Sequence, residues 1–529
     1  MSPGQNAVSG LPGGAPASAR GGAVPLAYLG LALALGAMTV AGFAPLHCWW
    51  LPPLTLGALM LIWRDATPRR AAALGFFFGL GWFCAGISWV YVSMHYVGGM
   101  PAVIAGLATV LFGAYLALFP ALAGWLQARL RGAFGSPYLH ALLVAPAAWA
   151  FSEWLRGWLF TGFPWVALGY AHTDGPYAGY APLLGIVGLD YLCALAAAML
   201  ALGAQPLLAR ASLKRVWLPL ATLAASVALG IGLRQVEWTP ASGAPFNVAL
   251  YQGNVPQELK FVEGRYEATL FNYRRMLAAQ PAELMVLPET ALPRMLNEIP
   301  RDYLRELALF AAQKKANIIV GVPRSEGGGR YFNSAISLGA DPVQSYDKVH
   351  LVPFGEFIPF GFRWFVAMMN IPLGDFTRGP AKPATMQLSG RQVALNICYE
   401  DLFGEEIIRQ LPQANVLVNI SNIAWFGDSL APHQHLQISR MRALETGRPM
   451  LRATNTGATA AIDEKGNVTA TLPYFTDAVL TAQVQGRSGA TPYVRTGNWP
   501  MVTLCALVLV VALWRVRRVR RARQARPRA

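Results

Sequence analysis

Eight apolar segments constrain the fold of this chain more than any other feature. They lie near residues 25–44, 47–63, 71–93, 101–126, 139–155, 184–208, 216–233 and 497–514. A helix needs about 20 apolar residues to cross a bilayer, so segments 47–63 and 139–155 are the shortest candidates. The chain is 54% hydrophobic and only 13% charged, which indicates a membrane protein. We therefore expect a bundle of eight transmembrane helices.

The basic residues predict how these segments are oriented. They cluster after every second apolar segment, at Arg64, Arg69, Arg70, Arg129, Arg131, Arg210, Lys214, Arg215 and the run from Arg515 to Arg523. The positive-inside rule then places both termini in the cytoplasm and residues 235–495 on the opposite side, the periplasm of a Gram-negative cell. We expect an inner-membrane protein. The net charge is +16, and the basic residues behind it lie beside apolar segments and in the C-terminal tail, as expected next to anionic lipid. We therefore expect no nucleic-acid partner.

The predicted domain organisation follows from this pattern. Residues 1–22 are rich in Gly, Ala, Ser and Pro and form a disordered leader without a clear secretory signal, so the first apolar segment stays as an anchor. Residues 23–234 form a transmembrane domain of seven helices, and residues 235–495 a periplasmic catalytic domain. Residues 496–516 form the eighth helix, and residues 517–529 a basic cytoplasmic tail.

Residues 235–495 alternate short β-branched runs with amphipathic stretches. This alternation predicts a layered α/β domain. The expected strands lie near 246–251, 283–288, 316–322, 334–338, 393–397, 416–420 and 458–462, and the expected helices near 265–279, 302–315, 402–411 and 434–446.

Cys398 follows one of these strands and is our candidate nucleophile. We expect a polar turn after it and then a helix over 402–411, whose positive end favours the thiolate. The other cysteines lie in or beside apolar segments, as buried free thiols commonly do. The sequence has no CxxC or HExxH metal motif, and we expect no metal or organic cofactor.

Two more reactive residues lie beside apolar runs. Glu289 ends Leu287-Pro-Glu289, and Lys348 begins Lys348-Val-His-Leu-Val-Pro-Phe-Gly-Glu356. If the strands are neighbours, a glutamate base, a lysine ammonium and a thiol meet at one sheet edge, which suffices for acyl transfer through a thioester. Taken singly, each charge could be a solvated surface residue. A histidine base from His350, His433 or His435 is the alternative.

Three aromatic residues are candidates for a substrate groove. The stretch 352–370 is too broken by Pro and Gly to span a membrane and too apolar for a solvated loop. It forms either a small satellite core or a membrane-dipping arm that binds an acyl chain. Trp425 and Phe426 could line the same groove, and Phe261 is the third candidate.

Several motifs together resemble one family. They are Tyr251-Gln-Gly-Asn-Val-Pro-Gln257, Leu-Pro-Glu289, Asp-Lys348-Val-His-Leu-Val-Pro-Phe-Gly-Glu356, Ile-Cys398-Tyr399-Glu400, Ser421-Asn-Ile-Ala-Trp-Phe-Gly427, Arg440-Met-Arg-Ala-Leu-Glu445, Arg452-Ala-Thr-Asn-Thr-Gly457 and Thr496-Gly-Asn-Trp-Pro500. The soluble part resembles the nitrilase superfamily. With eight spans around it, the whole chain resembles that superfamily's membrane-embedded branch, the bacterial apolipoprotein N-acyltransferases.

The resemblance implies a fold, a reaction and roles. The fold would be a nitrilase-like α-β-β-α sandwich carried on an eight-helix bundle. Cys398 would attack a phospholipid ester, with Glu289 as general base and Lys348, helped by the Tyr399 backbone N–H, as charge stabiliser; Glu356, Tyr399 and Glu400 would support them. The acyl group would pass to the α-amine of an S-diacylglyceryl cysteine of an apolipoprotein. We expect a monomer.

One position departs from the family pattern. Family members can carry a Trp a few residues after the Val-Pro-Gln motif, whereas this chain has Phe261. The aromatic ring is kept and the indole N–H is lost, which matters only if that N–H binds the substrate. Two other functions stay open at this point: a membrane-tethered amidase with water as acceptor, and a non-catalytic membrane scaffold or transporter with the same fold.

Overall fold

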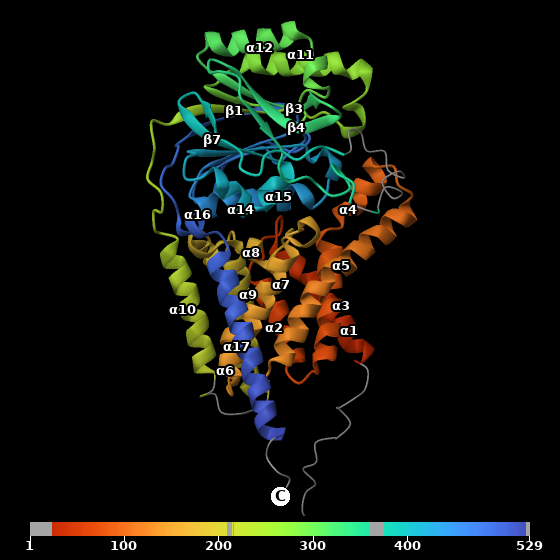
Figure 1. Ribbon diagram of the computed structural model, residues 1–529, viewed down its shortest axis with the longest axis vertical. Helices are drawn as coiled ribbons and strands as arrows, with labels where there is room; N and C mark the ends of the chain where they lie inside the picture. The colour runs from red at the N-terminus through yellow and green to blue at the C-terminus, as the bar shows by residue number, and fades with distance from the viewer. Residues whose placement is uncertain (1–23, 209–213, 215, 360, 362–374, 525–529) are drawn as a thin grey trace, which may run out of the picture.

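A computed structural model describes residues 24–208, 214, 216–359, 361 and 375–524. The predicted leader lies outside the described residues, as do residues 525–529 of the tail and much of the apolar stretch 352–370. The molecule has two parts, a helical body and an α/β domain stacked on one end of it (Figure 1). The C-terminal helix returns from the α/β domain along the helical body.

The helical body contains most of the apolar segments. Its helices are α1 (Leu26–Thr39), α2 (Leu51–Trp63), α3 (Pro68–Gly86), α4 (Trp89–Val92), α5 (Ala102–Arg129), α6 (Pro137–Leu139), α7 (Ala145–Arg156), α8 (Leu168–Ala171), α9 (Ala181–Leu208), α10 (Trp217–Leu233) and α17 (Trp499–Gln524).

Three of these helical stretches are long and apolar enough to cross a membrane: Ala102–Arg129, Pro176–Leu208 and Trp499–Ala522. A fourth arises if Pro68–Gly86 and Trp89–Val97, bent by 49° at their junction, count as one span. Shorter apolar helices occupy Leu26–Gly42, Leu51–Trp63 and Trp217–Leu233. Apolar helices therefore fit a membrane protein, and the full set of eight spans stays a prediction.

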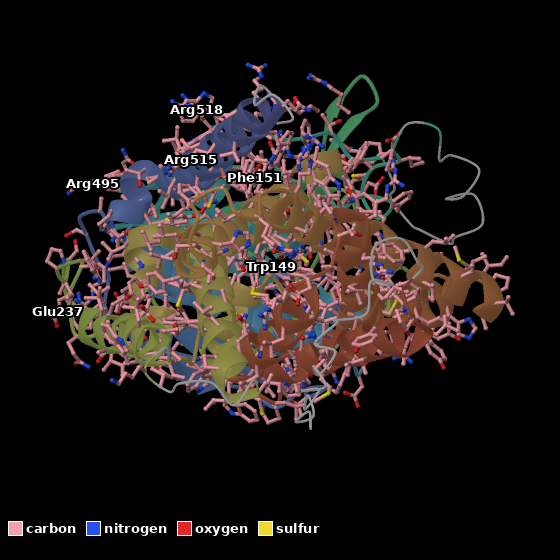
Figure 2. The ribbon with its side chains drawn as sticks, turned by 90° about the horizontal axis from the view of Figure 1, so that it is seen from below. Trp149, Phe151, Glu237, Arg495, Arg515 and Arg518 are labelled. Atoms are coloured by element: carbon pink, nitrogen blue, oxygen red, sulfur yellow. The ribbon has the colours of Figure 1, made fainter. Side chains whose placement is uncertain are left out.

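The interior of the helical body is aromatic and contains one buried ion pair. Trp149 lies among the helices and is 1% exposed, whereas Arg515 and Arg518 project from α17 at the periphery (Figure 2). Arg156 pairs with Glu153, one helical turn away, at 2.5 Å. The Arg156 guanidinium also donates to the carbonyl of Trp165 at 2.9 Å. This pair is buried, and it fixes the loop that follows α7.

The α/β domain contains two six-stranded mixed sheets, which confirms the predicted layered fold. The first sheet has the order β12-β1-β2-β3-β4-β5 and the second β11-β10-β9-β8-β7-β6. The strands are β1 (Phe246–Gln252), β2 (Leu284–Val286), β3 (Asn317–Gly327), β4 (Arg330–Gly339), β5 (Ser345–Asp347), β6 (Met386–Leu388), β7 (Arg391–Ile397), β8 (Val416–Ser421), β9 (Met450–Thr454), β10 (Ala460–Ile462), β11 (Val468–Thr471) and β12 (Ala478–Val484).

Helices cover the outer faces of both sheets. Helices α11 (Glu263–Ala279) and α12 (Arg301–Gln313) pack on the first sheet through one apolar cluster. Helices α14 (Gly404–Ile407), α15 (Ala431–Thr446) and α16 (Pro492–Thr496) lie between the second sheet and the helical body (Figure 1). A second apolar cluster, with Val286, Val393 and Val418 among its members, fills the space between the sheets. The layers are therefore α-β-β-α.

Buried hydrogen bonds join α15 to the helical body. The Trp165 indole N–H donates to the Gln434 side chain at 2.7 Å, and the Gln434 amide donates to the carbonyl of Gly86 at 3.1 Å. The backbone N–H of Ala44 donates to the Gln437 side chain at 3.1 Å. Because buried polar groups need partners, these contacts fix the register between the two parts.

Candidate active site

Cys398 lies where β7 ends, on a tight turn rather than at the start of a helix. Residues 398–402 form a single 3₁₀ turn, and the regular helix that follows has only four residues, Gly404–Ile407. The predicted helix over 402–411 is therefore present in part, as α14 and the 3₁₀ turn Ile408–Gln410 that continues it. Before it, Glu400 and Asp401 are both buried and bind partners on opposite sides of the 3₁₀ turn.

The backbone of Cys398 is strained and its side chain is nearly enclosed. Its φ is +53°, a conformation that residues other than glycine seldom adopt and that is often kept at functional sites. The residue is 8% exposed. Burial, with a further contribution from the Glu289 charge, raises the pKa of the Cys398 thiol. The predicted helix-stabilised thiolate is therefore wrong: the resting nucleophile is a neutral thiol that needs a base.

Glu289, Lys348, Glu356 and Asn333 form a buried group that we call the reactive cluster. Lys348 Nζ lies 2.8 Å from Glu356 Oε1 and 3.5 Å from Glu289 Oε1. The Asn333 amide donates to both carboxylates, at 2.6 Å to Glu289 and 2.7 Å to Glu356. Glu289 follows β2, Lys348 follows β5 and Asn333 lies on β4, so the first sheet supplies three of the four members.

The surroundings of Glu289 and Lys348 fix the protonation states of the reactive cluster. Burial opposes ionisation of Glu289, but the Lys348 ammonium and the Asn333 and Asn422 donors hold the pKa of Glu289 below its ordinary value. Burial likewise opposes the charge on Lys348, but Glu356 and Glu289 raise its pKa above the ordinary value. At neutral pH a carboxylate and an ammonium therefore lie beside a neutral thiol. The charge of Glu289 raises the pKa of that thiol and the charge of Lys348 lowers it. The carboxylate can accept the thiol proton.

Glu400 connects the Cys398 turn to the segment that carries Lys348. Its carboxylate accepts the backbone N–H groups of Val349 and His350 at 2.6 and 3.0 Å, and that of Ile397 at 2.6 Å. The Tyr346 hydroxyl adds a fourth bond at 2.8 Å. Glu400 thus fixes the nucleophile relative to Lys348.

Tyr399 points the other way, into the helical body. Its hydroxyl donates to the carbonyl of Gly162 at 2.9 Å, in the loop after α7. Its ring lies beside Phe163, with ring centroids 6.4 Å apart. The turn that bears the nucleophile therefore contacts both parts of the molecule.

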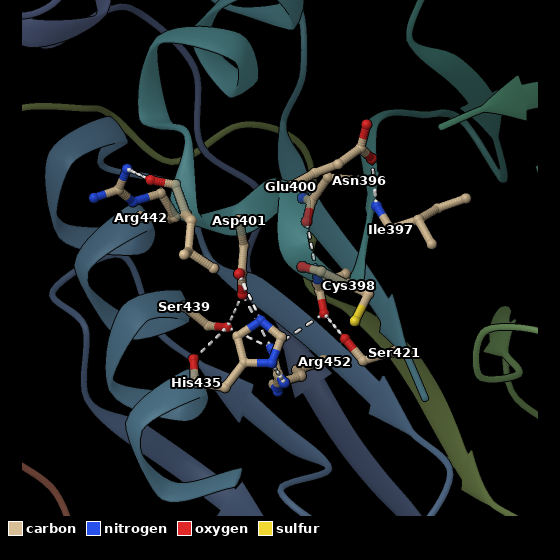
Figure 3. A network of polar contacts seen from close by, with 12 residues as sticks. Asn396, Ile397, Cys398, Glu400, Asp401, Ser421, His435, Ser439, Arg442 and Arg452 are labelled. Atoms are coloured by element: carbon tan, nitrogen blue, oxygen red, sulfur yellow. Dashed lines mark hydrogen bonds and ion pairs between the residues drawn. The ribbon is translucent and has the colours of Figure 1, made fainter. Parts of the chain in front are cut away.

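A second buried group, Asp401, His435, Ser439 and Arg452, lies on the other side of the turn; we call it the supporting cluster (Figure 3). Asp401 accepts from His435 Nε2 at 2.6 Å, from Ser439 Oγ at 2.5 Å and from Arg452 at 3.0 Å. Arg452 also donates to the side chain of Asn419, and the Asn419 amide donates to the carbonyl of Cys398 at 3.1 Å. The supporting cluster thereby holds the backbone of the nucleophile.

The three candidate histidines have other partners. His350 stacks on Phe403 and contacts Glu406 at 3.3 Å, and His433 contacts the Tyr474 hydroxyl at 3.2 Å. His435 belongs to the supporting cluster, and burial lowers its pKa. These contacts favour Glu289 over a histidine as the base.

The groove candidates lie in three different settings. Phe426 packs edge-on against Trp89 of the helical body, with ring centroids 4.7 Å apart. Its neighbour Trp425 is half-buried, and Phe261 is 38% exposed. The three side chains are not joined by a described groove, because much of the stretch 352–370 lies outside the described residues. Their role in substrate binding stays a prediction.

Several residues of the site were not assigned a role from the sequence. Asn422 lies in a motif noted above, and its backbone N–H donates to Glu289 Oε2 at 2.7 Å. Arg452 also lies in such a motif, and its full burial was not foreseen. Asn333 had a usable signal, a lone amide at the start of an apolar run. Lys260, between Leu259 and Phe261, is 4% exposed and lies against Glu289.

Comparisons with known proteins agree with this architecture. The family model described as "Apolipoprotein N-acyltransferase N-terminal domain" matches residues 35–199, and the one described as "Carbon-nitrogen hydrolase" matches residues 231–493. The apolipoprotein N-acyltransferase of Ralstonia nicotianae is 49% identical over 506 residues, which cover 94% of this chain and 95% of the relative. Those of Nitrosomonas europaea and Chromobacterium violaceum are 48% and 46% identical, over 90% and 92% of this chain and 95% and 94% of the relatives. The chain belongs to the apolipoprotein N-acyltransferase family.

Proposed function

We propose that this protein transfers a fatty acyl group from a membrane phospholipid, through a thioester on Cys398, to the α-amino group of the S-diacylglyceryl cysteine of an apolipoprotein. One observation carries the proposal: a buried carboxylate, Glu289, and a buried ammonium, Lys348, 3.5 Å apart, interact electrostatically with a neutral buried thiol. Membership of the family supplies the substrate classes.

The first half-reaction forms the thioester. Glu289 accepts the proton of Cys398 as the sulfur attacks the ester carbonyl carbon of a phospholipid, with phosphatidylethanolamine as the expected donor. The Lys348 ammonium and the backbone N–H of Tyr399 stabilise the tetrahedral oxyanion. As the ester C–O bond breaks, Glu289 returns the proton to the glycerol oxygen. A lysophospholipid leaves and the acyl group stays on Cys398.

The second half-reaction makes the amide. The neutral α-amine of the apolipoprotein attacks the thioester carbonyl carbon, and Glu289 accepts a proton from the nitrogen. When the C–S bond breaks, this proton passes to the sulfur and restores the thiol. The two substrates react in turn, so the kinetics are ping-pong.

The supporting residues act on the position of the reacting groups. Glu356 holds Lys348 at 2.8 Å, and Glu400 ties the nucleophile turn to the segment after β5. Tyr399 joins that turn to the helical body through Gly162. Phe261, Trp425 and Phe426 are the side chains that we expect to contact the lipid chains.

The membrane setting completes the proposal. Residues 23–234 and 496–516 form an eight-helix body in the bacterial inner membrane, residues 235–495 form the periplasmic catalytic domain, and residues 1–22 and 517–529 are a cytoplasmic leader and tail. The alternation of basic and non-basic loops and the three apolar helices support this arrangement. The chain acts as a monomer on a phospholipid donor and a lipoprotein acceptor, without a cofactor.

Intact-mass spectrometry after incubation with phosphatidylethanolamine tests the thioester. We expect a mass increase of one acyl group that hydroxylamine removes, absent in Cys398→Ala and Cys398→Ser. Addition of a diacylglyceryl peptide should discharge the adduct and acylate the peptide amine. A protein that gains no mass while the lipid stays unconsumed would overturn the lipid-donor step.

The match to the carbon–nitrogen hydrolase model raises one alternative, an amidase that uses water as acceptor. Ammonia release from small amides without added phospholipid separates the two. Release that depends on Cys398, with no acyl transfer to the peptide, would favour the amidase.

A further inference from the structure

Lys260 is a buried cation beside the reactive cluster to which the proposed mechanism gives no role. It follows the 3₁₀ turn Gln257–Leu259 and is 4% exposed. The Gln257 side chain accepts from the Asn422 amide at 2.7 Å, and the backbone N–H of Asn422 donates to Glu289 at 2.7 Å. One residue, Asn422, therefore fixes both the segment that carries Lys260 and the carboxylate of Glu289.

The ammonium of Lys260 lies against the general base. Its Nζ donates to the backbone carbonyl of Glu289 at 3.2 Å. Its charge interacts favourably with the Glu289 carboxylate and with an ionised Cys398. Burying a lysine is costly unless its charge is compensated, so its place beside Glu289 calls for an electrostatic reason.

The charge count of the site supplies that reason. The reactive cluster has two carboxylates, Glu289 and Glu356, against the single ammonium of Lys348. Arg452 on the other side of the turn is already paired with Asp401 at 3.0 Å. One negative charge therefore remains in the reactive cluster, and it would oppose any further negative charge on the sulfur or on an oxyanion. A second buried ammonium removes this imbalance.

We propose that Lys260 is a positioning residue of the acyl transfer: its ammonium balances the charge of the reactive cluster and holds the backbone of Glu289 in place. The role rests on the proposed function. It acts in both half-reactions, because each passes through a state with negative charge next to Cys398. Lys260 itself neither gains nor loses a proton during the reaction.

The pH dependence of Lys260 provides a readout that a purely structural side chain would not have. Burial lowers the pKa of Lys260 to about 8, although Glu289 and Cys398 oppose the shift. The described charged groups that act on it are Glu289 and an ionised Cys398; Glu289 in turn pairs with Lys348, and Lys348 pairs with Glu356. Lys260 is therefore an ammonium below pH 8 and neutral above it. Lys348, whose pKa is raised, keeps its charge throughout this range.

The rate of acyl-enzyme formation, followed by mass spectrometry from about pH 6 to pH 10, tests the proposal. In the wild type the rate should fall as the pH rises through about 8, where Lys260 loses its charge. Lys260→Arg keeps the charge, so its rate at pH 7 should stay within a fewfold of the wild type while the alkaline fall disappears. Lys260→Met should be slower by at least about tenfold at pH 7, equivalent to about one pKa unit, and should show no fall near pH 8.

Two controls make each outcome decisive. Lys382→Met removes an exposed lysine and should leave both rate and profile unchanged. Unfolding temperatures show whether Lys260→Met folds. If it does not, the pH profile of Lys260→Arg still tests the role of Lys260. If the wild type forms the thioester and Lys260→Arg keeps the alkaline fall, the role of Lys260 is overturned while the proposed function stands. If the wild type forms no thioester, the proposed function itself is overturned, and this role with it.

Discussion

The reactive cluster and the supporting cluster lie on opposite sides of one turn and contain similar residues, yet only the first can move a proton. In the supporting cluster His435 Nδ1 lies 2.8 Å from Arg452, which can only donate, so His435 carries its proton on Nε2 and donates it to Asp401 at 2.6 Å. Each of these protons already has an acceptor. In the reactive cluster the Glu289 carboxylate faces a thiol whose proton it can accept. Both clusters bury charged side chains. They differ because only the reactive cluster has a neutral acid beside it, the Cys398 thiol.

The replacement Glu289→Gln should produce the largest effect and shows whether this difference is real. Gln cannot accept the thiol proton, so acyl-enzyme formation should fall by about 10³- to 10⁴-fold, near the upper range for a general base. Gln keeps the shape of Glu, but its amide nitrogen cannot accept the bond that Asn333 or Asn422 donates, so the unfolding temperature should also fall and the rates are compared for folded protein. Time-resolved mass spectrometry measures the rate, with the exposed Glu267→Gln as the matched control. A rate within tenfold of wild type would mean that another residue is the base.

Arg452→Met should act on stability instead. The change leaves Asp401 buried without its cation, and breaking a buried ion pair in this way costs about 3–5 kcal/mol. Chemical unfolding of the detergent-solubilised protein measures the loss. The exposed pair of Arg274 and Glu306, 2.7 Å apart, offers the control, because Arg274→Met should cost at most about 1 kcal/mol. An Arg452→Met protein of normal stability but without activity would mean that the supporting cluster takes part in the chemistry. The two clusters would then not differ in function.

Tyr399→Phe should have a smaller effect, at the contact between the turn and the helical body. It removes one buried hydrogen bond to the carbonyl of Gly162, typically worth about 1 kcal/mol. We expect a modest loss of stability and a change in the KM for phospholipid larger than the change in kcat, because the contact connects the nucleophile turn to the loop after α7 of the helical body. Tyr96→Phe, at a residue that is 72% exposed, is the control. An equal loss in both variants would remove any special role for this contact.

The sequence predicted the reactive cluster better than the groups around it, for a physical reason. Glu289 and Cys398 each come just after a buried strand, and Lys348 comes just before an apolar run, so each of the three has a local signal. Their strands belong to both sheets, β2 and β5 to the first and β7 to the second, rather than to the one sheet edge that the sequence predicted. The helix after the Cys398 turn was predicted too long, because its α-helical part is only Gly404–Ile407 and a 3₁₀ turn at Ile408–Gln410 completes it. The burial of Glu400 and Asp401 in the preceding turn depends on distant segments and had no local signal. Lys260 and Glu289 are separated by 29 residues, and their contact exists only after the chain has folded. Long-range compensation of charge leaves little trace in a local sequence pattern.

The acid side of the pH profile gives the smallest expected change and is therefore a sharp test of the reactive cluster. The cations and donors around Glu289 hold its pKa below the ordinary value of 4.5, so the base is ionised at every pH above that. Acyl-enzyme formation at pH 5 should then be within about twofold of the rate at pH 7, since most of Glu289 is still a carboxylate. In Lys348→Met, which removes the nearest cation, burial would dominate and raise the pKa of Glu289, so the residual rate should fall on going from pH 7 to pH 5. A wild-type rate that halves between pH 7 and pH 6 would indicate a base that titrates near neutrality, as a histidine does. His435 would then become the first candidate, and the supporting cluster would have to give up a proton that its hydrogen bonds now hold in place.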